Sequence, residues 1–370
     1  MSTDLLLVAG ARPNFVKLAP LYHALGEQSS LNFKIVHTGQ HYDHELSQAF
    51  FDDLGIPEPD VNLEVGSGSH AEQTGAIMTR FEPVVNDLRP KWIAVFGDVN
   101  STVACALTAA KLGVKVAHVE AGLRSHDWTM PEEINRVVTD RLSDRLYTPS
   151  RDACDNLKAE GITQDRIKFV GNIMVDTLRR QLPRVDRKRV LKEYQLRPQG
   201  YVLVTLHRPS NVDDGDTLLR VCHLLGEAAK REPVVFPAHP RTASRIEEPT
   251  ARSALGATRV VPPLPYPTFL GLMAEARVVV TDSGGVQEET TALGVPCLTI
   301  RENTERPITI SEGTNRLVGV EPTEFANALQ SANTRRNRVP ELWDGRTADR
   351  IAADLSNLVT AADREVAPVR

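Results

Sequence analysis

The sequence predicts an α/β protein of two domains, each a doubly wound parallel sheet covered by helices. The chain has 370 residues, more than one hydrophobic core usually supports. Short apolar runs alternate with helix-like segments from residue 5 to about 170, and the alternation restarts at Tyr201–Leu206 after a charged stretch over residues 178–200. We therefore expect domains over 1–172 and 173–350, and a terminal helix over 351–370 that is a candidate to pack back on the first domain.

Composition indicates a soluble cytoplasmic protein. The chain is 41% hydrophobic and 25% charged, and its net charge of -5 argues against a general nucleic-acid binder. The four cysteines form no Cys-x-x-Cys pair, which speaks against a zinc site or a disulfide framework. The apolar run Leu5–Val8 is too short for a signal-peptide core, and no run approaches the roughly 18 residues of a membrane span. We expect no membrane partner.

The first strand is expected at Leu5–Val8, before a glycine turn and a helix that starts near Phe15. The start of that helix offers free N–H groups to an anion. The turn is not Gly-x-Gly-x-x-Gly, so a nicotinamide dinucleotide is not expected. Arg12 and Lys17 suggest instead that side chains hold a phosphate; the alternative is two solvated surface cations.

Carboxylates follow the next strands of this domain. A strand over 33–38 leads to polar residues 39–42, and a helix ending near Leu88 leads to two strand-like runs that end at Asp98 and Glu120. A further helix opens at Pro131 with Glu132 in its first turn. Ligands of such sheets bind outside the carboxyl ends of the strands, so these acidic residues predict a reactive site.

Glu132 and Arg136 have two interpretations. They are four residues apart, and we expect them on the helix face opposite Ile134, Val137 and Val138, away from the packed side. Such a pair also fits a surface ion pair of little energetic value. Its place next to Asp98 and Glu120 in the expected fold favours a role in the site.

The second domain carries features suited to a phosphate. A strand over 277–281 is followed by Asp282, then by Ser283, Gly284 and Gly285 at the start of a helix, where the backbone can approach an anion closely. Asp282 also fits a helix cap. Glu289, one turn into the helix, fits either a surface charge or an acceptor for ribose hydroxyls.

Two histidines and an arginine join this group. His207 and His239 leave strands, and Arg306 follows the strand over 297–300. The two domains imply a central cleft, with carboxylates on one wall and phosphate-binding groups on the other. A nucleotide sugar has that division of chemistry.

Six segments carry a recognisable pattern. They are Gly10–Pro13, Gly97–Asp98, His118–Arg124, Pro131–Arg136, Asp282–Glu289 and Thr304–Pro307. In this order, and over about residues 5 to 320, the chain resembles the non-hydrolysing UDP-N-acetylglucosamine 2-epimerase family.

The resemblance implies a glycosyltransferase-B-like arrangement of two Rossmann-like domains and the interconversion of UDP-N-acetylglucosamine (UDP-GlcNAc) and UDP-N-acetylmannosamine (UDP-ManNAc). It also implies no added cofactor or metal, a homodimer, and a place in cell-surface polysaccharide biosynthesis. Carried over to matching positions, the catalytic residues are Asp98, Glu120, Glu132, Arg136 and His207. The residues implied to hold the UDP part are Arg12, Lys17, His239, Phe269, Ser283, Gly284, Gly285, Glu289 and Arg306.

Other activities remain as alternatives. Relatives that act on UDP-diacetamido-glucuronic acids carry a different sequence after the Thr-Glu pair, so Thr304–Ile310 favours UDP-GlcNAc. A UDP-sugar glycosyltransferase of the same architecture, a hydrolysing epimerase and a catalytically silent sensor are the rivals; the three carboxylates disfavour the transferase and the sensor.

One departure concerns regulation. Many members read His-Arg-Arg-Glu-Asn where this chain has His207–Asn211 with Pro209 and Ser210 at its centre. That loop borders the pocket in which bacterial members bind a second, activating UDP-GlcNAc. The departure predicts weakened activation.

Overall fold

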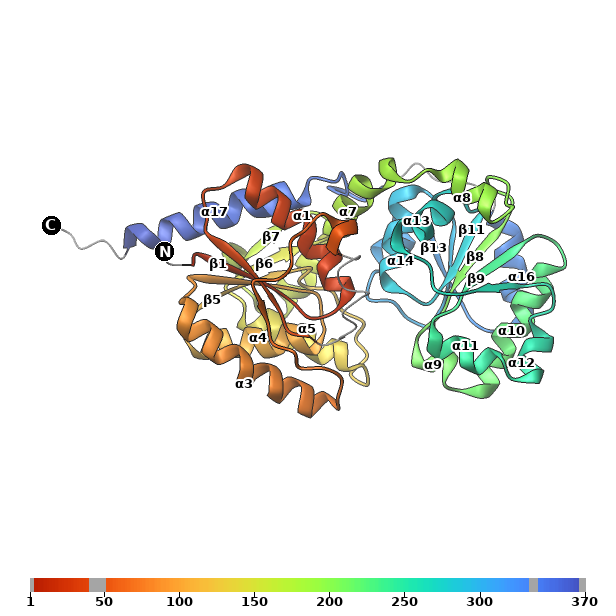
Figure 1. Ribbon diagram of the computed structural model, residues 1–370, viewed down its shortest axis with the longest axis horizontal. Coiled ribbons are helices and arrows are strands. Elements are labelled where there is room, and N and C mark those ends of the chain that lie inside the picture. The colour runs from red at the N-terminus through yellow and green to blue at the C-terminus, as the bar shows by residue number, and fades with distance from the viewer. Residues whose placement is uncertain (1–2, 40–50, 333–338, 366–370) are drawn as a thin grey trace. The chain divides into compact units, whose positions relative to one another are not determined.

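The computed structural model describes residues 3–39, 51–332 and 339–365, except for the side chains of Arg241 and residues 362–365. The polar residues expected at 40–42 lie outside this part. The chain forms two compact units: unit 1 contains Met1–Thr177 and Glu341–Arg370, and unit 2 contains Leu178–Pro340 (Figure 1). The chain thus crosses to unit 2 after Thr177, where residue 172 was expected, and returns at Glu341, where residue 351 was expected.

Unit 1 contains a seven-stranded parallel sheet in the order β3-β2-β1-β4-β5-β6-β7. Its strands are β1 (Leu5–Ala9), β2 (Phe33–His37), β3 (Val61–Asn62), β4 (Trp92–Phe96), β5 (Lys115–Val119), β6 (Arg145–Thr148) and β7 (Ile167–Phe169). Its helices are α1 (Arg12–Gln28), α3 (His70–Leu88), α4 (Asn100–Lys111), α5 (Pro131–Leu142), α6 (Arg151–Ala159), η1 (Gln164–Arg166), α7 (Ile173–Gln181, which runs into unit 2) and α17 (Thr347–Glu365).

The sheet of unit 1 is covered on both faces. Along β1, Leu5 and Leu7 pack in a core shared with α1 and α17, whereas Leu6 and Val8 pack in a second core with α3 and α4. Successive strand residues point to opposite faces, so a continuous apolar run is what a strand buried on both sides requires. The strand order reverses between β1 and β4, which makes their carboxyl ends the switch point where ligands of such sheets bind.

The C-terminal segment belongs to unit 1, and Figure 1 shows α17 beside α1. Ile351 and Leu355 of α17 are fully buried in the core that contains α1. The helix is anchored at its start by Asp176, whose carboxylate accepts a hydrogen bond from the Ala348 N–H at 2.7 Å. Trp343, just before α17, donates to the Pro149 carbonyl at 3.0 Å.

Unit 2 contains a six-stranded parallel sheet in the order β10-β9-β8-β11-β12-β13. Its strands are β8 (Val202–Thr205), β9 (Val234–Pro237), β10 (Arg259–Val261), β11 (Val278–Thr281), β12 (Cys297–Ile300) and β13 (Asn315–Val318). Its helices are η2 (Leu182–Arg184), α8 (Arg187–Glu193), α9 (Pro209–Val212), α10 (Gly215–Ala229), α11 (Pro240–Ile246), α12 (Pro249–Ala254), α13 (Tyr266–Glu275), α14 (Gly284–Leu293), α15 (Ile308–Ser311) and α16 (Pro322–Ser331).

The same two-sided packing holds here. Val202 and Val204 of β8 contribute to one core, and Leu203 between them contributes to the other. The order reverses between β8 and β11, so the loops after these strands lie at the switch point of unit 2. The predicted fold class, two doubly wound α/β domains, is confirmed. Among the described residues, no helix is both long enough and apolar enough to cross a membrane.

Candidate active site

Asp98 and Glu120 stand at neighbouring strand ends of unit 1. β4 and β5 are paired so that Phe96 lies opposite Val119, and the Gly97 N–H donates to the Val119 carbonyl at 3.1 Å. Asp98 follows this pair on one strand and Glu120 on the other. The sequence-based expectation that carboxylates gather at this edge of the sheet agrees with the structure.

Glu120 forms an ion pair with Lys17 of α1, and both residues are buried. A Cβ at Gly97 would lie 2.9 Å from the Lys17 Nζ and 3.3 Å from the Glu120 Oε2. Glycine is therefore needed where the β4 loop passes this pair, and its φ of +65° adds a second reason. Because Lys17 is buried, the alternative of a solvated surface cation is wrong for this residue; Arg12, at the start of α1, is exposed.

The backbone of Glu120 is itself unusual. Its φ is +73°, a left-handed conformation that costs a residue with a Cβ about 1–3 kcal/mol. Such a conformation persists only where the surrounding structure holds it, and it is found preferentially at functional sites.

Asp98 is held by Arg136 of α5. The Arg136 Nε and Nη2 approach the Asp98 Oδ2 at 2.9 and 2.8 Å, and the Arg136 Nη1 pairs with Glu133. The Asn135 side chain also donates to the Asp98 carbonyl at 2.9 Å. Arg136 is 3% exposed, and its charge is neutralised by these two carboxylates.

The expected orientation of α5 is wrong. Arg136 lies on the buried face together with Glu133, whereas Ile134 and Val138 are 46% and 37% exposed. Glu132, expected beside Arg136, is exposed. The apolar side of a helix is normally its packed side, but α5 packs its polar side against the strand ends that carry the site.

Glu133 is the residue that sequence reasoning missed. It accepts from the Ser125 N–H at 3.0 Å, the His126 N–H at 2.9 Å and the Arg136 guanidinium. Burial alone raises the pKa of the Glu133 carboxyl, but these donors outweigh it and lower the pKa below its ordinary value. Glu133 is thus an ionised partner that fixes Arg136 against Asp98.

In unit 2, Asp282 organises the loop after the neighbouring strand β8. Its fully buried carboxylate accepts from the His207 N–H at 3.1 Å, the Arg208 N–H at 2.9 Å and the Asn211 side chain at 3.1 Å. The N-cap of α14 is Ser283, so the interpretation of Asp282 as that cap is wrong. The His207 ring, 51% exposed as a side chain, lies with its Nδ1 3.3 Å from Asp282.

The Ser-Gly-Gly turn begins α14 as expected. Ser283 makes no side-chain cap hydrogen bond within the described residues, so the first N–H groups of the helix lack that partner. A Cβ at Gly284 would lie 2.4 Å from the Arg306 Nη1 and 2.7 Å from the Glu305 Oε1. A larger residue at this position would therefore have to displace the ends of these two side chains.

Arg306 lies among buried carboxylates. Its Nε is 2.9 Å from the Glu288 Oε1, and its Nη1 pairs with Glu305. Arg301 contacts Glu305 from the other side at 2.7 Å. Glu288 and Glu305 are 1% and 3% exposed, and these arginines help to make their burial tolerable; Arg208 adds a third cation, 3.8 Å from the Glu305 Oε1.

Glu289 is also buried and accepts a hydrogen bond from the Tyr266 hydroxyl at 2.7 Å. Burial, together with the nearby charge of Glu288, raises the pKa of the Glu289 carboxyl to about 7, although the Tyr266 hydrogen bond opposes the rise. The alternative of a surface charge is wrong. Phe269, half-buried on the same helix as Tyr266, packs against the core of unit 2, and His239 is exposed at the end of β9.

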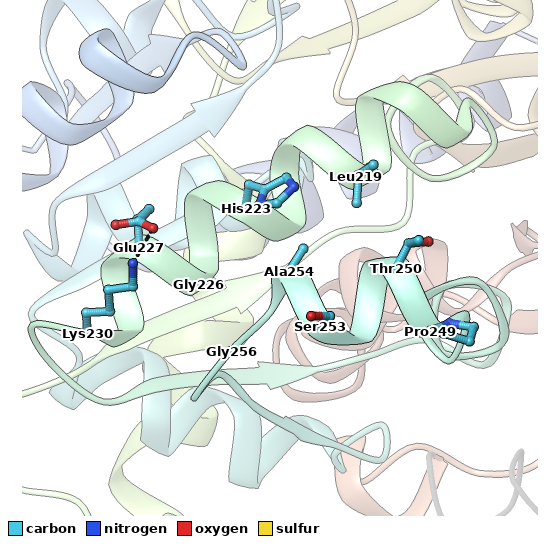
Figure 2. Close-up of a pocket in the computed structure, with 10 residues that line it drawn as sticks. All are labelled: Leu219, His223, Gly226, Glu227, Lys230, Pro249, Thr250, Ser253, Ala254 and Gly256. Carbon is cyan, nitrogen blue, oxygen red and sulfur yellow. Dashed lines mark hydrogen bonds and ion pairs between the residues drawn. The ribbon is translucent and has the colours of Figure 1, made fainter.

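A groove of about 580 Å³ lies elsewhere on unit 2, between α10 and α12 (Figure 2). The side chains of Glu227 and Lys230 point toward one another at one end of it and form an ion pair at 2.5 Å. None of the residues expected to bind the nucleotide lines this groove. Among the described residues, no three His, Cys, Asp or Glu side chains are grouped so as to hold a metal ion.

Comparison with known proteins places this geometry in a family. The family model described as UDP-N-acetylglucosamine 2-epimerase matches residues 23–356. A UDP-N-acetylglucosamine 2-epimerase from Methanocaldococcus jannaschii is 39% identical over 95% of this chain and 98% of its own length. A UDP-2,3-diacetamido-2,3-dideoxy-D-glucuronate 2-epimerase from Pseudomonas aeruginosa is also 39% identical, over 96% of this chain and 99% of its own.

A solved structure agrees over the same span. The crystal structure of the M. jannaschii UDP-GlcNAc 2-epimerase in complex with UDP-GlcNAc and UDP aligns with a TM-score of 0.88 at 39% identity, over 96% of this chain and all of that one. Sequence and fold agree over nearly the whole length, and the chain belongs to the UDP-N-acetylglucosamine 2-epimerase family.

Proposed function

We propose that this protein interconverts UDP-GlcNAc and UDP-ManNAc by inversion at C2 of the sugar. The observation that carries the proposal is the arrangement in unit 1, where Asp98 and Glu120 end adjacent strands and each is paired with its own cation. Proton removal and return at one carbon need two such groups, one for each face.

The chemistry requires that UDP leave the sugar. The C2 proton is not next to a carbonyl, and a positioned carboxylate contributes only about 10²- to 10⁴-fold to a proton transfer. Breaking the C1–O bond, with its electron pair going to the phosphate oxygen, gives the sugar oxocarbenium character that acidifies C2–H. A carboxylate then takes the proton, and 2-acetamidoglucal and UDP form. Proton delivery to the other face of C2 and re-addition of UDP give the epimer.

The carboxylates of unit 1 are assigned to the proton transfers. Asp98 and Glu120 are held by buried cations, and exposed Glu132 supplies a third group at the start of α5. Arg136 fixes Asp98, and His207, exposed at the end of β8, is assigned a supporting role. Deuterium labelling at C2 with single variants of these carboxylates would show which one acts on which face of the sugar.

The nucleotide is assigned mainly to unit 2. The start of α14 offers its N–H groups and helix dipole to the phosphates as UDP leaves, a stabilisation that grows with the charge on the leaving group. Glu289, with its raised pKa, is suited to hydrogen-bond ribose hydroxyls. The remaining groups proposed for UDP are Arg12, Lys17, His239, Phe269, Ser283, Gly284, Gly285 and Arg306.

A second candidate is the epimerisation of a UDP-diacetamido-glucuronate. The P. aeruginosa relative named for that sugar is as similar as the M. jannaschii one. We favour UDP-GlcNAc because relatives that act on UDP-diacetamido-glucuronic acids carry a different sequence where this chain has Thr304–Ile310. Incubation with each sugar nucleotide separately decides between them, since only the true substrate turns over at C2.

We further propose a cytoplasmic homodimer that supplies cell-surface polysaccharide biosynthesis. The cytoplasmic placement is supported by four free, buried cysteines, as expected of a reducing compartment. Light scattering on the purified protein tests the dimer, with a molar mass near twice 40.8 kDa expected. The direct test of the activity is incorporation of solvent deuterium at C2, with formation of UDP-ManNAc and no added cofactor.

A further inference from the structure

His118 is a fully buried polar residue between the apolar residues Ala117 and Val119 of a strand. It lies in β5, two residues before Glu120, and is 0% exposed. Its Nε2 is 2.8 Å from the Gly97 carbonyl and its Nδ1 is 2.6 Å from the Asp140 Oδ1. A carbonyl oxygen only accepts, so the Nε2 donates to Gly97, and the other ring nitrogen faces the Asp140 carboxylate.

His118 is the first of four residues joined by polar contacts that run from the core to exposed Glu160. Asp140 contacts His118 and also the Arg124 Nη2 at 2.8 Å. Arg124 in turn makes two hydrogen bonds to Glu160, at 2.7 and 2.8 Å. The pKa of the Asp140 carboxyl, which burial alone would raise, is lowered by His118 and Arg124. The contacts thus join His118, Asp140, Arg124 and Glu160 in that order.

His118, Asp140 and Arg124 hydrogen-bond to the backbone just before Asp98 and just after Glu120. On the β4 side, His118 holds the carbonyl of Gly97, the residue directly before Asp98. On the β5 side, Asp140 accepts from the Gly122 N–H at 3.1 Å, and Arg124 donates to the Leu123 carbonyl at 2.7 Å. The turn that these bonds fix begins at Glu120, whose positive φ needs such support.

We propose that His118 is a positioning residue that, through Gly97 and Asp140, fixes Asp98 and Glu120 relative to one another for proton transfer at C2. This inference rests on the proposed epimerase function and adds a residue to it. A small misplacement of a reacting group costs about 10²-fold in rate, so the role is large enough to measure.

The test compares two conservative variants. His118→Gln places an amide donor where Nε2 stood and keeps the Gly97 contact; His118→Asn places one where Nδ1 stood and keeps the Asp140 contact. We expect each to lower kcat for C2 deuterium exchange from UDP-GlcNAc by about tenfold or more. UDP binding is assigned mainly to unit 2. The dissociation constant for UDP should therefore stay within about twofold of that of the wild-type protein.

The matched control is His223→Gln, at an exposed histidine of α10, which should keep normal kcat. Glu160→Gln changes the exposed residue that ends this series of contacts, and it serves as a milder variant if the His118 variants do not fold. We expect kcat to fall about twofold to fivefold with unchanged UDP binding.

Three results would overturn the assignment. If the His118 variants folded and kept a near-normal kcat, the positioning role of His118 would be refuted, but the proposed function would stand. Parallel losses of kcat and UDP affinity would indicate general damage instead. If the wild-type protein failed to exchange the C2 hydrogen, the proposed function would be refuted, and the role of His118 with it.

Discussion

The Arg136 guanidinium approaches a single oxygen of Asp98 through both Nε and Nη2, at 2.9 and 2.8 Å, while its third nitrogen pairs with Glu133. One buried cation thus lies between two carboxylates of which only Asp98 is partly exposed. The geometry leaves Asp98 open to a substrate on one side while its position is fixed on the other.

Asp98→Asn and Glu120→Gln should each lower kcat by at least about 10²-fold, the usual contribution of a positioned acid or base. The dissociation constant for UDP should change much less in Asp98→Asn, because Asp98 is not among the proposed UDP contacts. Glu120→Gln should change it more, because the variant also removes the carboxylate partner of Lys17, a proposed UDP contact. Steady-state kinetics with UDP-GlcNAc and calorimetry with UDP give the two quantities. Asp216→Asn, at an exposed carboxylate of α10, is the control. Near-normal kcat in Asp98→Asn would refute its assignment.

Arg306→Ala should weaken UDP binding and also lower the free energy of unfolding by about 3 kcal/mol or more, because Glu288 and Glu305 lose a buried cationic partner. Arg306→Lys keeps the charge but loses the planar fork, so it should retain more stability while still binding UDP weakly. Chemical denaturation and UDP titration on both variants separate the two effects. An alanine variant of unchanged stability would show that the ion pairs contribute nothing.

Stability should fall as pH rises from about 4.5 to 7 through the titration of Glu289. Its pKa is about 7 in the folded protein against an ordinary 4.5, so the folded state binds the proton more tightly. The stabilisation, about 3 kcal/mol, is complete at pH below the unfolded-state pKa and is lost as the pH rises through the folded-state pKa. Glu289→Gln should flatten this part of the pH profile of thermal unfolding, and Glu247→Gln, at an exposed carboxylate, should leave it unchanged. Equal slopes in both variants would contradict the assignment.

Activation by a second UDP-GlcNAc should be weak. Such coupling is typically worth about 1–3 kcal/mol and needs a ligand that prefers the competent state. Exposed Pro209, at the first position of α9, and Ser210 offer no charged fork to a pyrophosphate. Initial rates from purified UDP-ManNAc should follow a near-hyperbolic curve without a lag. The double change Pro209→Arg with Ser210→Glu should introduce a lag that traces of UDP-GlcNAc abolish; a long lag before any substitution would show that the activating site is intact.

The placement of the site was predictable because parallel sheets direct their strand ends to one edge. Apolar runs located β4 and β5, and the carboxylates that follow them had to meet there. The same logic placed Ser283 and the two glycines after β11.

The orientation of side chains was harder to predict. An apolar stripe normally marks the packed face of a helix, but α5 buries Glu133 and Arg136 against the site and leaves Ile134 exposed. No spacing rule distinguishes Glu132 from Glu133 once the packed face is misassigned. His118 and Asp140 lie on different elements and meet only in the folded structure, so no local sequence pattern predicts their contact.

The central claim is tested most directly by proton NMR of UDP-GlcNAc incubated with the purified protein in D₂O. Elimination and re-addition predict that the C2 proton signal is lost as solvent deuterium enters, while UDP-ManNAc appears and no metal or nicotinamide is needed. Formation of UDP-ManNAc that retains the original C2 hydrogen would contradict the mechanism, and no reaction at C2 would contradict the function itself.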